Sequence, residues 1–351
     1  MSRQIALDTI NLKPVERLAH TDYSLDYHKH LVRKMTGLDP SHPDASRKFA
    51  DACGIDFFFG TYDGLHGDWA ARGRATNMGH AVYAADGSDR VEPAECPFKN
   101  EEDVWGFDAV AEYGLPDFDE QVASYEQIAR NAREKFPNQL STGGYYKSII
   151  SGAIAAFGWE MLLLGASDNA KMEKVLDSFY RFTKFHMEAW AKTSAEVIIQ
   201  HDDFVWTIGP FMHPDYYRKV IIARYAEMWK VLHAAGKKVL FCSDGTFTEL
   251  AGDLADAGAD GFIFEPMNDF GFMVSNFGQT KCLVGSYVDC RDMTFGKWAK
   301  VKDDMDRSFA AAKKCKGMMF AVGNHLPANI PEDMIERYLA YLMANWSTSN
   351  E

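Results

Sequence analysis

The sequence predicts an α/β protein with a single (β/α)8 TIM barrel and a helical N-terminal extension. Four short apolar runs in its last third each end on a residue that can bind a metal or move a proton, namely Cys242, Glu265, Asp289 and His325. These residues are 23, 24 and 36 positions apart, enough for a strand, a loop, a helix and a return loop. In such a barrel all strands end on one face, so we expect the four side chains to converge on one mouth, where active sites of this fold lie.

The predicted elements follow one another as alternating strands and helices. Residues 1–50 are expected to be a helical lead-in, and residues 51–351 a single catalytic barrel domain. Runs rich in β-branched and aromatic residues predict buried strands, and helical zones at 120–135 and 149–193 separate some of them. The eight expected strands lie within 55–60, 104–108, 139–145, 195–203, 238–245, 260–266, 281–289 and 317–325.

Composition predicts a cytoplasmic enzyme without a nucleic-acid or membrane partner. The six cysteines lie far apart without paired spacing, so a disulfide framework is not expected. The longest apolar stretch, residues 153–166, contains Glu160 and is too short to span a bilayer, and no basic and then apolar leader opens the chain. A formal net charge of -13 would repel the phosphates of a nucleic acid.

Three of the strand-end residues form the expected metal site. Cys242, Glu265 and His325 offer a thiolate, a carboxylate and an imidazole. Zinc accepts all three, and a catalytic zinc uses three protein ligands and keeps one position open. Each residue taken singly also fits a structural role, as a small core thiol, a loop ion-pair partner or a buried hydrogen bonder. Their joint position at the barrel mouth favours the metal interpretation, with Cys290 as an alternative ligand.

Two acidic residues are the expected catalytic groups. Successive strand residues face opposite sides, so only one of Asp202 and Asp203 can point into the mouth. We favour Asp203, as a group that holds substrate or acts as acid or base. A helix cap or a turn carboxylate is the alternative role for this pair. Asp244 is expected to face the substrate, and His201 is interpreted as structural.

Aromatic and polar side chains at predicted loops and strand ends are the expected substrate contacts. Such a set can sandwich an aromatic ring or enclose a quaternary ammonium group, because cations bind to aromatic faces. Most aromatic residues of a barrel belong to its core, and the segment 77–80 also fits a simple turn. The predicted substrate-binding residues are Tyr62, Trp69, His80, Tyr146, Trp206 and Asn324.

Several segments, taken together, resemble the uroporphyrinogen decarboxylase superfamily and, within it, the corrinoid-dependent methyltransferases. The similarity runs over roughly residues 50–345 and is carried by the acidic segment 201–203 with the turn at 209–214, and by the segments 236–245, 285–289 and 323–333. True decarboxylases carry an arginine-rich turn after the first strand, whereas residues 61–67 contain no arginine here. Because substrate carboxylates need such cations, this departure disfavours a porphyrinogen as the substrate.

The resemblance implies a zinc-dependent methyltransferase. Such an enzyme would demethylate a small methoxylated aromatic or a methylated amine and pass the methyl group to the cobalt of a corrinoid protein, and zinc would stabilise a leaving oxygen. The family's zinc ligands, a His-x-Cys pair and a late cysteine, correspond to Cys242-x-Asp244 and Asn324 here, with His325 adjacent. The expected partners are that corrinoid protein, which carries the cobalamin, and the small methyl donor, and a homodimer is compatible with the sequence.

Other interpretations stay open from the sequence. One is a lyase of the decarboxylase type, which would act on a carboxylated ring compound without metal. Another is a noncatalytic barrel that binds a corrinoid or another ligand without turnover. Within the methyltransferases, the reverse reaction, from corrinoid to a thiol or to tetrahydrofolate, is a further variant.

Overall fold

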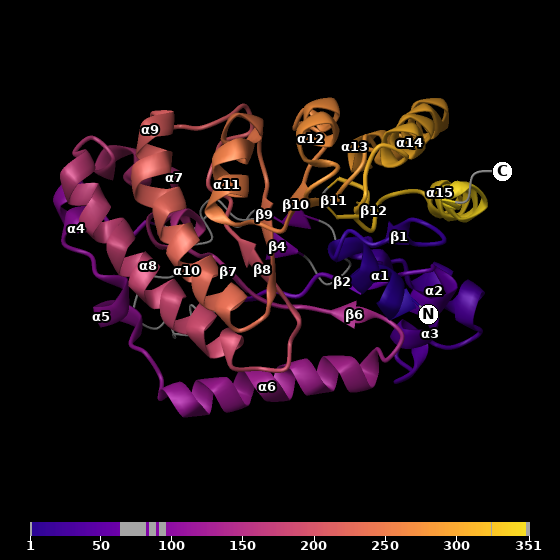
Figure 1. Cartoon of the computed structure of the whole chain (residues 1–351), viewed down its shortest axis with the longest axis horizontal. Coiled ribbons are helices and arrows are strands. Elements are labelled where there is room, and N and C mark those ends of the chain that lie inside the picture. Colours follow the sequence, from indigo (N-terminus) through magenta and orange to yellow (C-terminus); the bar gives the residue numbers. More distant parts are fainter. Residues whose placement is uncertain (1, 64–81, 84–88, 91–95, 324, 349–351) are drawn as a thin grey trace.

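A parallel sheet lies at the centre of the molecule, with helices packed around it (Figure 1). The computed structural model describes residues 2–63, 82–83, 89–90, 96–323 and 325–348. Neighbouring strands of this sheet are parallel throughout. In spatial order they are β1 (Ala19–His20), β12 (Met318–Phe320), β11 (Cys282–Val284), β10 (Gly261–Phe264), β9 (Lys238–Ser243), β8 (Val197–His201), β7 (Gly143–Tyr146) and β3 (Tyr62–Asp63).

The two edges of this sheet are linked through a second, shorter sheet. A second parallel pair, β2 (Phe57–Phe58) and β6 (Leu140–Ser141), directly precedes β3 and β7 along the chain. The backbone N–H of Asp56 donates to the carbonyl of His20 at 2.9 Å, and the Thr21 hydroxyl donates to the carbonyl of Phe57 at 2.8 Å. These bonds connect β1 with the β2 segment, and the predicted α/β barrel architecture is confirmed.

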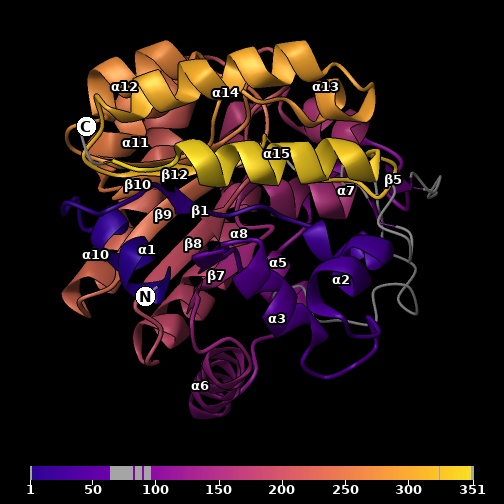
Figure 2. The same ribbon diagram turned by 90° about the vertical axis from the view of Figure 1, so that its right-hand side faces the viewer.

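The helices cover the outside of the strands. Figure 2 shows α14 and α15 side by side, outside β12 and β1. The other regular elements that are described are a short antiparallel pair, β4 (Val82–Tyr83) and β5 (Asp89–Arg90), two 3-10 helices at Leu25–Tyr27 and Thr248–Leu250, and a π-helical stretch at Tyr217–Ile222. The helices are α1 (Ser2–Ile10), α2 (Lys29–Thr36), α3 (Ala45–Ala52), α4 (Glu101–Trp105), α5 (Ala109–Tyr113), α6 (Phe118–Lys135), α7 (Ile150–Gly165), α8 (Asn169–Ala191), α9 (Pro214–Tyr216), α10 (Ala223–Ala234), α11 (Ala251–Ala257), α12 (Phe270–Phe277), α13 (Cys290–Thr294), α14 (Trp298–Ala312) and α15 (Glu332–Asn345).

One predicted strand is wrong, and one strand comes from an unexpected place. The segment 104–108 ends helix α4, because the Asn100 side chain accepts a hydrogen bond from the N–H of Asp103 and three acidic residues occupy the first helical turn. The missing strand is β1, which lies within the expected helical lead-in and pairs with β12. With only two residues, β1 is too short to show the alternation by which a strand is recognised in a sequence.

The interior of the barrel is closed at the amino ends of its strands. Val197 and Ile199 pack in the interior cluster, whereas Ile198 between them packs toward the helix layer. Ile5 and Ile10 of α1 belong to the same interior cluster, so this helix fills that end. The carboxyl ends of the strands therefore provide the open end of the barrel, and residues of β8 with odd numbers face its centre.

A buried carboxylate fixes the open end of β8. Asp202 is fully buried and accepts hydrogen bonds from the N–H groups of Ile149, Ile150 and Ser151 at 2.9, 3.1 and 2.6 Å. Its Oδ2 also accepts the hydroxyl of Tyr225 at 2.6 Å. One side chain thus holds the start of α7 and the first turn of α10 to the end of the strand. This is the cap role considered for the Asp202–Asp203 pair.

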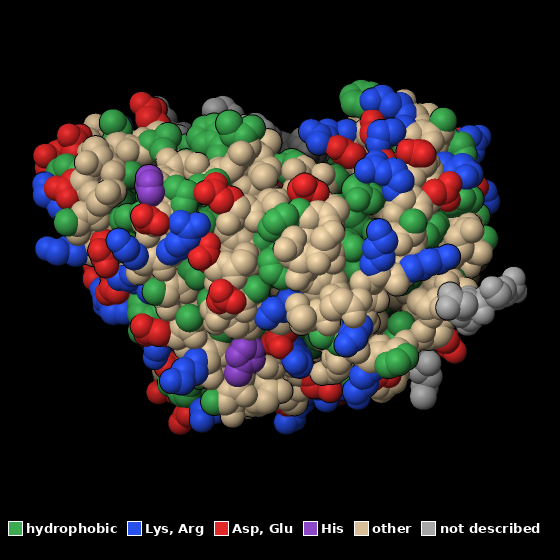
Figure 3. Space-filling view, turned by 45° about the horizontal axis from the view of Figure 1, so that its top comes forward, with side chains coloured by type: hydrophobic (Ala, Val, Ile, Leu, Met, Phe, Trp, Pro, Cys, Tyr) green, Lys and Arg blue, Asp and Glu red, His purple; other side chains and the backbone are tan. Residues whose placement is uncertain are grey.

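The outer surface shows no concentration of one charge on the face that Figure 3 presents, where lysine and arginine side chains are intermixed with aspartate and glutamate. Within the part of the chain that the structure describes, no helix combines the length and the apolar character needed to cross a membrane.

We expect the substitution Asp202→Ala to lower the free energy of unfolding by about 3 kcal/mol, because it leaves buried N–H groups and the Tyr225 hydroxyl without an acceptor. The matched control is Asp168→Ala. Asp168 caps α8 in an exposed position by accepting from Ala170 and Lys171, and its loss should cost only about 1 kcal/mol. Urea denaturation of both variants measures the difference, and equal losses would contradict the structural role of Asp202.

Candidate active site

A cavity of about 230 Å³ occupies the open end of the barrel. Its walls combine aromatic rings with titratable groups from the ends of neighbouring strands. Among the described residues that line it there is no lysine or arginine. The titratable lining residues are Tyr23, Tyr146, His201, Asp203, Cys242, Asp244 and Glu265, and the other aromatic ones are Phe57, Phe59 and Phe264.

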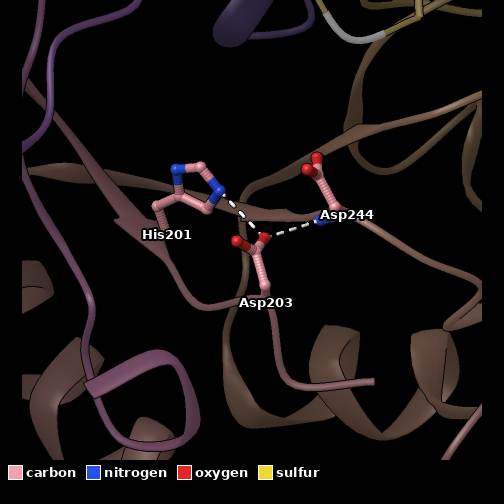
Figure 4. Close-up of side chains that lie close together, drawn as sticks. All are labelled: His201, Asp203 and Asp244. Atoms are coloured by element: carbon pink, nitrogen blue, oxygen red, sulfur yellow. Dashed lines mark hydrogen bonds and ion pairs between the residues drawn. The ribbon is translucent and has the colours of Figure 1, made fainter. Parts of the chain in front are cut away.

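His201, Asp203 and Asp244 form a compact cluster in this cavity (Figure 4). Each offers one ligand atom, and these atoms all lie within 4.8 Å of one another. His201 Nε2 lies 3.0 Å from Asp203 Oδ1, which also accepts the backbone N–H of Asp244 at 2.9 Å. When the Asp203 carboxylate is ionised it only accepts hydrogen bonds, so Nε2 is then the donor in the histidine contact.

Tyr146 completes the surroundings of Asp203. Its hydroxyl donates to Asp203 Oδ2 at 3.0 Å, and its ring stacks on the His201 imidazole with centroids 4.0 Å apart. The backbone N–H of Asp203 donates to the hydroxyl of Ser151, in the first turn of α7. The Asp203 carboxylate is therefore held in one orientation by three neighbouring elements.

A tight turn after β9 places Asp244 and Glu265 in the cavity. Gly245 has φ of 78°, and a Cβ there would lie 2.6 Å from the carbonyl oxygen of Trp206, so a side chain does not fit. The Gly245 N–H donates to Glu265 Oε2 at 3.0 Å. Glycine at this position thus lets two strand ends approach each other closely.

Negative charge accumulates in the cavity. The Asp244 carboxylate opens into it and makes no hydrogen bond or ion pair with any described residue, and much of the residue is open to solvent. Desolvation by the cavity walls raises the pKa of Asp244 above its usual value, and the charges of Asp203 and Glu265 raise it further. Burial, followed by the charges of Asp244, Asp203 and Glu265, also raises the pKa of the Cys242 thiol well above normal. A bound cation would relieve both effects.

The structure places the predicted metal ligands in two different surroundings. Cys242 and Glu265 line the cavity together with the predicted catalytic residues Asp203 and Asp244. His325 is buried, pairs with Tyr23 in a short β-bridge and is not among the lining residues. Instead, the imidazole near the carboxylates belongs to His201, which the sequence analysis interpreted as structural. Strand alternation could have indicated this position of His201, because residues 201 and 203 face the same side of β8.

The predicted substrate contacts are likewise divided. Tyr146 lines the cavity, whereas Tyr62 packs on Trp190 with ring centroids 5.6 Å apart and is not among the lining residues. Trp206 is exposed on the surface beside the cavity. Trp69, His80 and Asn324 lie outside the described residues.

Comparisons with known structures show the fold. A methyltransferase from Methanosarcina mazei is 14% identical in sequence, with a TM-score of 0.65 over 98% of both chains. D-psicose 3-epimerase with D-tagatose from Clostridium cellulolyticum H10 is 12% identical, with a TM-score of 0.36 over 70% of this chain and 90% of its own. 3-Dehydroquinate dehydratase from Geobacillus kaustophilus HTA426 is 11% identical, with a TM-score of 0.31 over 76% and 98%. The last two likenesses are too distant to carry an argument.

Comparison at the level of sequence gives the family. No curated protein matches the chain. The model of the uroporphyrinogen decarboxylase (URO-D) family matches residues 94–343, which is more than two thirds of the chain. The chain therefore belongs to the uroporphyrinogen decarboxylase family.

Proposed function

We propose that the protein is a zinc-dependent methyltransferase that demethylates a small methoxylated aromatic or a methylated amine and passes the methyl group to the cobalt of a corrinoid protein. The observation that carries this proposal is the cluster of His201, Asp203 and Asp244 at the barrel mouth, beside the Cys242 thiol. The likeness of the whole chain to a methyltransferase of the same fold supports it.

The residues of the cluster fit a zinc ion. An imidazole nitrogen and two carboxylate oxygens lie within reach of one ion, and the Asp244 carboxylate makes no other bond among the described residues. Cys242 and Glu265 line the same cavity and are further candidate ligands. When bound, zinc would supply positive charge next to the leaving oxygen or nitrogen.

The chain's own side chains would bind and orient the methyl donor. The rings of Phe57, Phe59 and Phe264 offer apolar and aromatic walls for a ring or a methylated ammonium group. Tyr146 keeps its proton, because burial and then the charges of Asp203 and Asp244 raise its pKa far above normal. Its hydroxyl can therefore hold the Asp203 carboxylate throughout the reaction.

The bond changes balance without a further reactant. The reduced cobalt supplies an electron pair to the methyl carbon, and the pair of the broken carbon–oxygen or carbon–nitrogen bond leaves with the heteroatom. The methyl carbon must point out of the cavity, toward the acceptor. The open carboxyl end of the barrel permits this approach.

We expect purified protein to contain about one zinc per chain, and Asp244→Ala and Cys242→Ala to lower the zinc content. Glu249→Ala, which removes an exposed carboxylate shortly after β9, is the matched control and should keep its zinc. His325→Ala separates the observed cluster from the sequence-predicted ligand set, and here the zinc should also remain. Elemental analysis of the four variants measures this. Full zinc content in Asp244→Ala would contradict the proposed site.

We expect no reaction with methoxylated aromatics or methylated amines until a reduced corrinoid protein is added. The absorbance of cobalt(I) should then fall as methylcobalt forms, and free cob(I)alamin should serve as a weaker acceptor. A decarboxylase of this family would need no such acceptor. Release of carbon dioxide from uroporphyrinogen by the protein alone, unaffected by a chelator or by Cys242→Ala, would replace the methyltransferase proposal with the decarboxylase alternative.

A further inference from the structure

An uncharged segment rich in aromatic residues follows β8 and reaches the surface. Residues 204–212, with the sequence Phe-Val-Trp-Thr-Ile-Gly-Pro-Phe-Met, contain no charged side chain. Ile208, at the tip of a turn, is 91% exposed, the highest value among the large hydrophobic side chains described, and Trp206 is 45% exposed. Solvent exposure of such large apolar side chains is unfavourable unless a partner covers them. The composition of the segment is also that of an interface core, which is depleted in charged residues and enriched in aromatic ones.

The turn is held rigidly in its exposed position. Trp206 N–H donates to the carbonyl of Gly209 at 2.8 Å, and Gly209 N–H donates back to the carbonyl of Trp206 at 3.1 Å. From the neighbouring loop, the Thr246 hydroxyl donates to the carbonyl of Thr207 at 2.7 Å, and its N–H donates to the carbonyl of Trp206 at 3.2 Å. A preorganised turn loses little conformational entropy when it binds, so its apolar tip is suited to recognition.

Aromatic rings of neighbouring residues pack against the turn at residues 206–209. The Trp159 ring, on α7, lies 4.9 Å from that of Trp206 and 5.3 Å from that of Phe211, measured between centroids. Trp159, Trp206, Ile208 and Phe211 together are called the tryptophan patch below. Large aromatic side chains at such sites contribute most of the binding energy of many interfaces.

The tryptophan patch borders the cavity without lining it. Its Trp206 follows Asp203 by three residues, and Thr246, which anchors the turn, follows Asp244 by two. None of the four patch residues is among those that line the cavity. A molecule seated on the patch would therefore lie next to the mouth that contains the two carboxylates.

We propose that the tryptophan patch is the docking surface for the corrinoid protein that accepts the methyl group, an inference that rests on the proposed function. The cobalt must come within bonding distance of the methyl carbon, so its carrier protein has to sit over the mouth and contact the border of the cavity. A second copy of this chain on the same patch would cover the mouth and exclude the acceptor, which favours the corrinoid protein as the occupant.

The test compares two acceptors of the methyl group. Ile208→Asp should lower kcat/KM for methylation of the corrinoid protein at least about tenfold, because it places a charge in the centre of the interface. With free cob(I)alamin as the acceptor, the rate should not change, since Ile208 does not line the cavity. Leu115→Asp is the matched control, because Leu115 is 40% exposed between α5 and α6, which lie along the lower side of the molecule in Figure 1, whereas α9 lies at its upper left.

Each outcome decides between the inference and its alternatives. Equal kcat/KM values for Ile208→Asp and the unsubstituted protein would sink the docking surface and leave the proposed function standing. Equal losses with both acceptors would also sink it, because the substitution would then act on the site itself. No methyl transfer to either acceptor by the unsubstituted protein would overturn the proposed function together with the docking inference. A dimer that Ile208→Asp converts to a monomer in sedimentation would assign the patch to a second copy of the chain.

Discussion

The carboxylate of Asp202 is the interaction on which the geometry of the site depends. Burial of an ionised side chain is strongly unfavourable unless hydrogen bonds replace its water, and here three backbone N–H groups and the hydroxyl of Tyr225 do so. The N–H groups belong to the start of α7, so the negative charge also lies at the positive end of that helix dipole. The neighbouring Asp203 is thereby fixed on the opposite side of the chain, in the cavity.

A second buried network holds β1 to its neighbours. Asp22 Oδ2 lies 2.6 Å from His20 Nε2 and accepts the hydroxyl of Tyr338 at 2.8 Å, while its Oδ1 accepts the N–H of Val322 at 2.9 Å. The end of β1, helix α15 and the segment after β12 thus share one carboxylate. β1 contributes only two residues to the sheet, so few backbone hydrogen bonds join it to β12. The polar bonds to Asp22 strengthen this weak connection.

The acidic residues of the cavity support the proposed binding of a metal ion. Asp203, Asp244 and Glu265 approach one another closely enough to disfavour ionisation of Asp244, and the Cys242 thiol is buried beside them. Such repulsion is tolerated where a cation completes the site. The imidazole of the cluster comes from His201, at the end of β8, and one of its carboxylates from the turn after the neighbouring strand β9. Under the proposed function, these groups would take the place of the His-x-Cys pair that the resemblance to the methyltransferases implied.

The sequence by itself determined the barrel, the carboxyl-end location of the site and the side of β8 on which Asp203 lies, because strand alternation and strand–helix spacing are local properties of the chain. It also indicated that Cys242 and Glu265 reach the mouth. Only the tertiary structure decided that the imidazole beside the carboxylates is His201 and that His325 lies outside the cavity. Distances between residues on different strands depend on register and on the direction of each side chain, which no local pattern records. For the same reason β1 was missed, because the partner that makes its two residues a strand lies about 300 positions away in the sequence. Residues 104–108 were mistaken for a strand although Asn100 and the acidic residues that follow it are a local signal for the start of a helix.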